Sequence, residues 1–154
     1  MKSVDELSAS LRAAGRKVTP QRQAVFRALQ GSTVHPTAEA VFAEVRVELP
    51  TISLRTVYQT LNDLAEMHEL SVLDVGTGAA RFDPNLAPHH HLVCDGCGRV
   101  DDLHLDHPVL PDPSTLPGDF EVARAEVVIR GRCATCATGS PPSQPNQGGA
   151  PAHG

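Results

Sequence analysis

Residues 89–97 of this chain spell His-His-His-Leu-Val-Cys-Asp-Gly-Cys, and the rest of the sequence is organised around this stretch. It combines imidazoles with two thiols in the C-x-x-C spacing, which lets both sulfurs hold one ion from a tight turn. A second C-x-x-C pair follows near the end of the chain. The two pairs use all four cysteines, and they predict a tetrahedral structural Zn²⁺ site made by Cys94, Cys97, Cys133 and Cys136.

The cysteine pairs have two other interpretations, namely redox-active dithiols or disulfides. No signal peptide is visible, and permanent disulfides are disfavoured in a reducing compartment. The segment between the pairs, residues 98–132, is longer than the usual zinc-ribbon spacing. We therefore expect the ion to clamp the two ends of a small β domain.

Length and charge limit the class of protein. A chain of 154 residues makes one or two small domains. No apolar run approaches the roughly eighteen residues of a membrane span, so we expect a cytoplasmic protein with no membrane partner. The net charge of −5 argues against nucleic acid, but no acid lies between Glu6 and Glu39. The basic residues of that stretch are suited to meet phosphates, and they are Arg12, Arg16, Lys17, Arg22 and Arg27.

Four helices are predicted in the first 70 residues. Each starts at a local signal that satisfies or removes its first free amides, and these signals are the capping box Ser3–Glu6, Thr19 before Pro20, Thr37 and Ser53. The first three end at residues that break helices, which are Gly15, Gly31 and Pro50. The fourth runs from Leu54 to about Met67.

The fourth helix is the candidate recognition helix. Its apolar stripe is Leu54, Val57, Leu61, Leu64 and Ala65, while Arg55, Gln59 and Asn62 face outward with Tyr58 beside them. Arginine, glutamine and asparagine can read base edges in the major groove. An ordinary amphipathic surface helix has the same pattern. The strands expected over Leu70–Val75 and Ala80–Phe82, with a turn at Gly76-Thr77-Gly78, favour a winged helix-turn-helix.

The composition changes from Asp83 onward. Short β-prone runs surround the cysteine pairs, and they are Leu92-Val93, Arg99–Leu105 and Phe120–Arg130. Four prolines within Pro108–Pro117 disfavour a long helix there. The last residues are rich in Pro, Gly, Ser and Gln. We expect a winged-helix domain over 1–82, a dimerisation and metal-binding domain over 83–137, and a disordered tail over 138–154.

Three motifs together resemble the ferric uptake regulator family of bacterial metal-dependent repressors. They lie at residues 17–22, 53–61 and 89–98, and the match runs over about residues 7–136. The resemblance implies an α+β fold with an N-terminal winged helix-turn-helix domain and a C-terminal α/β dimerisation domain with structural zinc. It also implies a homodimer that binds AT-rich palindromic DNA operators when a regulatory metal is present, rather than an enzyme.

The resemblance also implies a regulatory metal site, made by His35, Asp83, His89, His91 and Asp102. An N/O-rich ligand set of this kind fits Fe²⁺ or Mn²⁺ better than a thiolate cage does. From the residues alone, His35 before Pro36 is interpreted as a loop histidine rather than a ligand, and Asp83 before Pro84 has the alternative interpretation of a turn residue. Asp101 is an alternative to Asp102, and His104 and His107 are treated as surface groups. Ala125 occupies the place of a histidine that belongs to a second site in many relatives.

Aspartate rather than glutamate at position 102 resembles the peroxide-sensing branch, in which Fe²⁺ and peroxide oxidise a ligand histidine, here His35 or His89. A plain iron or manganese regulator is the alternative, with a zinc regulator less favoured. The expected DNA contacts are Lys17, Arg22, Arg55, Thr56, Tyr58, Gln59 and Asn62. Two enzymatic alternatives are a metal-dependent hydrolase, with Glu69 or Asp101 as base, and a thiol oxidoreductase using Cys94 and Cys97. No nucleophile motif or substrate-binding glycine-rich loop supports either one.

Overall fold

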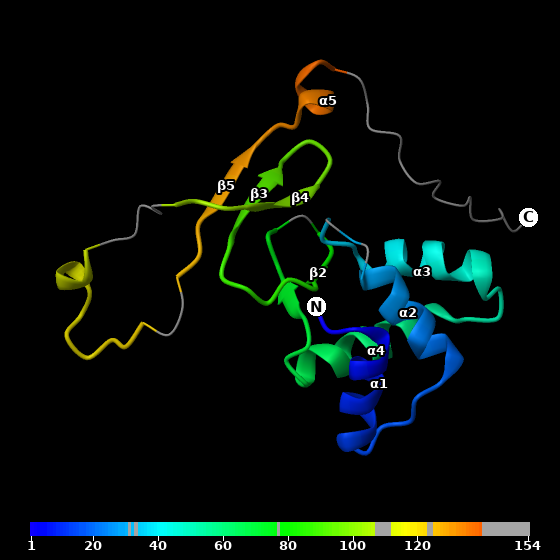
Figure 1. The fold of residues 1–154 in the computed structure, drawn as a ribbon. Coiled ribbons are helices and arrows are strands. Elements are labelled where there is room, and N and C mark those ends of the chain that lie inside the picture. The colour runs from blue at the N-terminus through cyan, green and yellow to red at the C-terminus, as the bar shows by residue number, and fades with distance from the viewer. Residues whose placement is uncertain (31, 33, 77, 107–111, 123–124, 140–154) are drawn as a thin grey trace, which may run out of the picture.

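The computed structural model describes residues 1–30, 32, 34–76, 78–106, 112–122 and 125–139. A helical half comes first and a three-stranded sheet second, as Figure 1 shows. The elements in order are α1 (Val4–Ala13), α2 (Pro20–Gln30), α3 (Ala38–Glu48), α4 (Leu54–Glu66), β1 (Ser71–Leu73), β2 (Arg81–Asp83), β3 (His90–Cys94), β4 (Val100–Leu103), η1 (Pro113–Thr115), β5 (Val128–Gly131) and α5 (Ala134–Ala137). None of the helices in these ranges is long and apolar enough to cross a membrane.

The predicted helix starts are confirmed. Ser3 accepts from the amide of Glu6, whose carboxylate accepts from the amide of Ser3, so the capping box is complete. Thr37 and Ser53 likewise accept from the third amide of α3 and α4. Helix α1 ends at Ala13, and Gly15 has a left-handed φ of 71° that glycine adopts without strain. Gly31 and Thr77 lie outside the described residues.

The helical half is held by one apolar core. All four helices contribute fully buried side chains to it, among them Leu7, Leu11, Phe26, Leu29, Val41, Val57 and Leu61. Burying each of these side chains stabilises the fold by about 1.5–3 kcal/mol relative to exposure. Helix α4 also buries Leu64 but leaves Arg55, Gln59 and Asn62 exposed, as its pattern predicted. The core therefore fixes which face of α4 reaches solvent.

The wing is a short antiparallel hairpin. Val72 of β1 pairs with Phe82 of β2, and Phe82 is buried in the helical core. Strand β1 is shorter than the predicted strand Leu70–Val75, whereas β2 has the predicted length of three residues but starts one residue later than Ala80. Strand β2 also runs one residue past the expected boundary at residue 82, because Asp83 still pairs with Ser71. We retain the division into residues 1–82 and 83–137 as a proposal.

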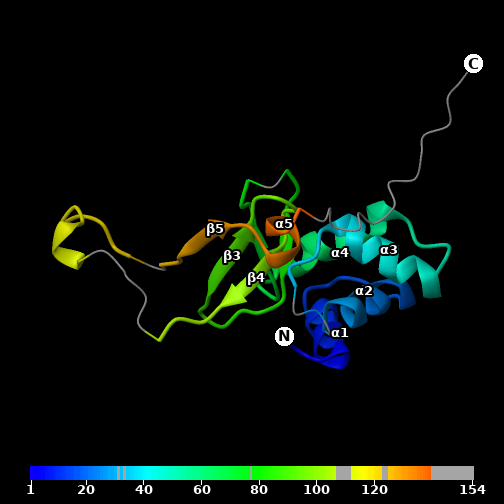
Figure 2. The same ribbon diagram turned by 90° about the horizontal axis from the view of Figure 1, so that it is seen from above.

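The second half is a sheet in the order β4-β3-β5. Strand β3 is antiparallel to β4 and parallel to β5, with His91 beside Val128. Among the described residues of the β-prone run Phe120–Arg130, Val128–Arg130 are strand, and they pair with His91–Val93 of β3. The described residues 112–122 lie far from the helices (Figures 1 and 2). Most of the expected tail, residues 140–154, lies outside the described part of the chain, as do Pro108 and Pro111.

The two halves meet along the segment that joins α2 to α3. Val34 forms a β-bridge with Asp101, and the amide of Phe82 donates to the carbonyl of Pro36 at 2.9 Å. His35 lies between these two contacts, and its Nδ1 is next to Val100, the first residue of β4. The apolar core of the sheet is small, with Leu73, Val93 and Val100 as its buried members. A core of this size favours additional stabilisation by a metal.

Candidate metal centres

The four cysteines form one cluster, referred to below as the sulfur cluster. Their sulfur atoms all lie within 4.8 Å of one another, although the two pairs are far apart in the sequence. Cys94 ends β3, Cys97 follows the next turn, and Cys133 and Cys136 lie at the start of and within α5. The cysteines are free thiols, and Cys97 Sγ is 3.9 Å from Cys133 Sγ. Two sulfurs bound at about 2.3 Å to one tetrahedral ion are separated by about 3.8 Å, so the spacing fits zinc.

The thiols of the sulfur cluster differ in acidity. Hydrogen bonds from the amides of Cys133 and Cys97 lower the pKa of Cys94 to about 6. Burial and the neighbouring sulfurs raise the pKa of Cys136 to about 12. Cys94 is therefore ionised at neutral pH, whereas Cys136 needs a nearby positive charge to ionise beside it. A divalent cation supplies that charge, which fits this donor set to a metal.

A second cluster lies where the two halves meet, and we call it the His/Asp site. It consists of His35, Asp83, His89 and His91, each with one ligand atom within 4.8 Å of the others. His35 precedes α3, Asp83 ends β2, and His89 and His91 lie at the start of β3. All four are buried, and His91 has no exposed surface. The structure thus brings together four of the five expected ligands.

The hydrogen bonds of the three imidazoles fix their tautomers. His35 Nδ1 lies 3.3 Å from the carbonyl oxygen of Val100, and His89 Nδ1 lies 2.7 Å from that of Ala87. His91 Nδ1 lies 2.5 Å from Glu126 Oε1. A carbonyl or carboxylate oxygen only accepts, so each ring donates from Nδ1 and keeps the lone pair of Nε2. These are the lone pairs that a metal binds.

Four buried atoms of the His/Asp site have no hydrogen-bond partner. They are the Nε2 atoms of His35, His89 and His91, together with Asp83 Oδ2. Asp83 Oδ2 lies 3.2 Å from His89 Nε2 and 3.8 Å from His91 Nε2. An unsatisfied buried polar atom costs about 1–3 kcal/mol, and four together would consume much of a small domain's stability. One divalent cation would satisfy all four, so the residues fit a metal with N/O ligands.

Asp83 is ionised in this site. Burial alone would raise the pKa of Asp83, but the neighbouring His35 ring, 3.5 Å from Asp83 Oδ1, and a hydrogen bond from the amide of Asn85 bring it below its ordinary value. For His35, burial lowers the pKa, but the neighbouring carboxylates of Asp83 and Asp102 outweigh burial and raise it. Asp83 therefore places a negative charge beside the three imidazoles, which favours the binding of a cation.

Asp102 lies at the edge of the His/Asp site. Its Oδ1 is 3.1 Å from His35 Nε2, and its Oδ2 accepts a hydrogen bond from Asn85. Asp101 instead pairs with Arg99, so it does not replace Asp102. His90 points away, and its Nδ1 accepts from the amide of Val127. His104 is exposed, with its ring centre 6.2 Å from that of His89, and His107 lies outside the described residues.

Three residues beside these clusters were not predicted. Asn85 orients both aspartates, Glu126 contacts His91, and Arg81 donates to the carbonyls of His35 and Gly98. An Asx turn after Asp83 was the only local signal for Asn85. Glu126 and Arg81 reach their partners across long sequence separations, so no spacing rule could have found them.

The expected DNA contacts fall into two groups. Lys17, Arg55, Tyr58, Gln59 and Asn62 are exposed. Thr56 is half-buried and its hydroxyl contacts that of Ser53 at the helix cap. Tyr58 donates a 2.6 Å hydrogen bond to Glu39 of α3. Arg22 instead forms a 2.6 Å ion pair with Asp63 and is 13% exposed, so it holds α2 against α4 and does not face solvent with the others.

A winged helix joined to a four-sulfur cluster and a buried His/Asp site defines a metal-responsive DNA-binding regulator. The model of the ferric uptake regulator family matches residues 13–115. The peroxide-responsive repressor PerR of Staphylococcus epidermidis is 36% identical over 136 residues, which cover 86% of this chain and 89% of that protein. PerR of Staphylococcus aureus is 35% identical, with 86% and 90% covered.

Two solved structures show the same fold. The Helicobacter pylori ferric uptake regulator Fur has a TM-score of 0.70 at 22% identity, covering 89% of this chain and 97% of that one. PerR from Streptococcus pyogenes has a TM-score of 0.51 at 23% identity, covering 88% and 94%. The chain belongs to the ferric uptake regulator family, and it is a metal-dependent transcriptional repressor. The resemblance drawn from the three motifs is thereby confirmed.

Proposed function

We propose that this repressor senses peroxide through Fe²⁺ or Mn²⁺ held in the His/Asp site, while Zn²⁺ in the sulfur cluster holds the second half together. The observation that carries the regulatory site is the convergence of four buried, unpaired ligand atoms. Asp102 Oδ1 is the nearby fifth ligand. The PerR relatives at 35–36% identity support peroxide as the signal. We also propose that the protein is located in the cytoplasm, where it would encounter both peroxide and DNA.

The site joins the two halves of the chain, which is how we propose that it controls DNA binding. His35 comes from the winged-helix half and Asp83 ends β2 at the boundary between the halves, while His89, His91 and Asp102 come from the second half. Ligands from both halves around one point fix the angle between them. A metal that binds the closed arrangement about a hundredfold more tightly shifts the equilibrium by about 2.7 kcal/mol.

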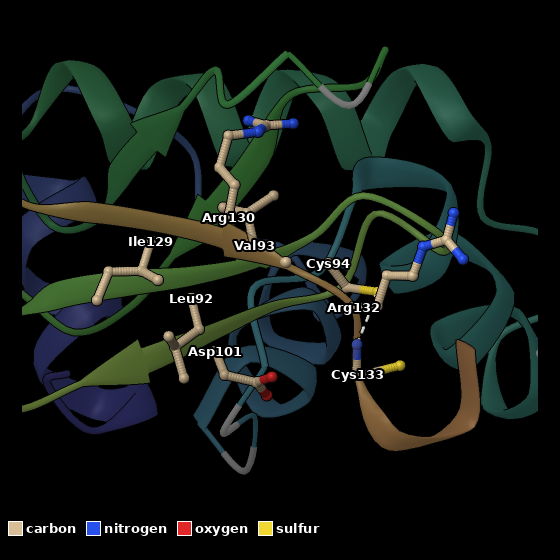
Figure 3. Close-up of a pocket in the computed structure, with 9 residues that line it drawn as sticks. Leu92, Val93, Cys94, Asp101, Ile129, Arg130, Arg132 and Cys133 are labelled. Carbon is tan, nitrogen blue, oxygen red and sulfur yellow. Dashed lines mark hydrogen bonds between the residues drawn. The ribbon is translucent and has the colours of Figure 1, made fainter. Parts of the chain in front are cut away.

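The family is dimeric, and we propose that β5 forms part of the dimer contact. β5 is an edge strand, and its residues are exposed. Figure 3 shows Leu92 and Ile129 side by side on this part of the sheet, and they are 39% and 46% exposed. An unpaired edge beside apolar surface suits pairing with a second copy. The two recognition helices would then stand about 34 Å apart, one turn of DNA.

Each α4 would read an AT-rich half-site through its exposed face. Gln59 and Asn62 can pair bidentately with adenine, and Arg55 with guanine. Lys17 would contact phosphate, and Thr56 and Tyr58 would border the same surface. An AT-rich palindrome is therefore the expected operator.

Metal-dependent gel shift on AT-rich palindromes tests the proposal. The zinc-loaded protein should bind with Fe²⁺ or Mn²⁺ and not without them. Binding that is equal with and without added metal would reject the role of the His/Asp site.

Peroxide sensing has its own test. Fe²⁺ would, when bound, supply the electrons that activate peroxide. In the net reaction, one oxygen atom of peroxide is added to an imidazole carbon and the other leaves as water. Mass spectrometry of the Fe²⁺ form should show +16 Da on peptides containing His35 or His89. The Mn²⁺ form is the control. Unmodified peptides together with retained operator binding would instead favour a plain iron or manganese regulator.

A further inference from the structure

The Nδ1 atom of His91 has a carboxylate partner, whereas the Nδ1 atoms of the other two imidazoles of the site do not. Its Nδ1 lies 2.5 Å from Glu126 Oε1, whereas His35 and His89 donate to main-chain carbonyls. His91 is fully buried, and the Glu126 side chain is 23% exposed. Because the ionised carboxylate can only accept, the ring must donate from Nδ1. The lone pair of Nε2 is thereby directed into the His/Asp site.

The main chain holds Glu126 in place opposite His91. Strands β3 and β5 are parallel, with His91 beside Val128. Val127, the residue before Val128, is held by two hydrogen bonds. Its carbonyl accepts from the amide of His91 at 3.0 Å, and its amide donates to His90 Nδ1 at 3.1 Å. Residue 127 is therefore fixed on both sides by consecutive histidines. Its neighbour Glu126 is placed where its side chain reaches the ring of His91.

The adjacent ring of His90 does not donate from Nδ1 as His91 does. The Nδ1 atom of His90 accepts a hydrogen bond, so its proton lies on Nε2, the opposite tautomer from His91. Neighbouring histidines of one strand thus take opposite tautomers because of their partners on the β5 side. Of these two rings, His91, which donates to Glu126, faces the His/Asp site, and His90 does not.

We propose that Glu126 is a positioning residue that fixes His91 in the Nδ1–H tautomer and raises the affinity of the His/Asp site for its metal. The metal part rests on the proposed function. A carboxylate acceptor makes the imidazole a stronger donor to a cation, and losing such a partner lowers metal affinity by about 10–100-fold. The contact also ties the site to β5, the strand at the exposed edge of the sheet.

The first test needs no regulatory metal. In zinc-loaded protein labelled with ¹⁵N-histidine, NMR should show the His91 ring protonated at Nδ1, and Glu126→Ala should yield a mixture with the Nε2–H form. Glu126→Gln should keep the wild-type tautomer, because its amide oxygen still accepts. Glu121→Ala is the matched control, since it removes an exposed acid from the same segment. A wild-type tautomer in Glu126→Ala overturns the proposal.

The second test measures Co²⁺ binding to the zinc-loaded protein by its visible absorption. Glu126→Ala should bind Co²⁺ about 10–100-fold more weakly and with a changed spectrum, and Glu126→Gln should fall between it and wild type. Zinc content should match wild type in all variants, and thermal unfolding should show that each variant is folded at the temperature of the titration. Equal affinity in Glu126→Ala and wild type overturns the inference alone. A wild-type protein that binds no second metal overturns the proposed function instead.

Discussion

Arg81 donates from Nη1 to the main-chain oxygen of His35 at 3.2 Å. Its Nη2 donates to the carbonyl of Gly98, the residue after Cys97, at 2.5 Å. One guanidinium from the wing thus connects the His/Asp site to the turn of the sulfur cluster. Neither metal cluster is structurally independent of the other, because they share this side chain.

Replacing Arg81 with Ala should weaken this connection and the fold. Two carbonyls lose a charged donor, which costs about 1.5–3 kcal/mol per hydrogen bond to a charged group. Urea unfolding of the zinc-loaded protein measures the loss. The control is Arg99→Ala, because Arg99 is exposed and pairs only at the surface with Asp101. A surface pair contributes about 0–1 kcal/mol, so equal losses in the two variants would contradict the connecting role of Arg81.

Replacing His91 with Ala should abolish metal-dependent operator binding while zinc is retained. The change removes a ligand from the centre of the His/Asp site and leaves the sulfur cluster untouched. Gel shift with Mn²⁺, beside zinc analysis and circular dichroism, measures this. His104→Ala is the matched control, since that ring is exposed and its centre lies 6.2 Å from the ring of His89. Unchanged metal dependence in His91→Ala would reject the proposed site.

Gly96→Ala should loosen the sulfur cluster. A Cβ at this position would lie 2.8 Å from both Cβ and Sγ of Cys136, too close for either atom. Overpacking of this kind costs about 1–3 kcal/mol, so zinc should be lost to a chelator faster than from wild type. At Gly131, beside the same cluster, an added Cβ meets nothing within 4 Å. Gly131→Ala should therefore keep its zinc, and equal zinc loss from both variants would contradict the prediction.

Tyr58 offers an optical probe of the recognition helix, because the chain has one tyrosine and no tryptophan. Its hydrogen bond to Glu39 raises the pKa of the phenol, since ionisation would place two negative charges together. Tyrosinate absorbance should therefore appear at a higher pH in wild type than in Glu39→Gln. Glu44→Gln, which changes another exposed acid of α3, should leave the titration as in wild type. Identical curves for wild type and Glu39→Gln would show that the contact is absent in solution.

The features that sequence predicted well depend on local chemistry. Ser3, Thr37 and Ser53 satisfy amides three residues away, so the helix starts could be found by inspection. The two C-x-x-C pairs predicted one metal cluster, because this spacing lets both sulfurs of a pair bind the same ion.

The features that local sequence patterns alone could not predict depend on strand register and packing. The His/Asp site was found through the family resemblance, because residues 35 and 83 meet 89 and 91 only in the folded chain. Glu126 could not be placed without knowing that β5 runs parallel to β3. Arg22 looked like a phosphate contact until its ion pair with Asp63 was visible.

The parallel pairing of β3 with β5 also sets an order of events on the ribosome. The winged-helix half is complete by residue 83, but His91 meets Glu126, and Cys94 meets Cys133, only after some forty further residues have been made. At about 5–20 residues per second, translation leaves several seconds in which the winged-helix half has been synthesised but the His/Asp site and the sulfur cluster are incomplete. Both metal clusters are consequently completed later in synthesis than the winged-helix half.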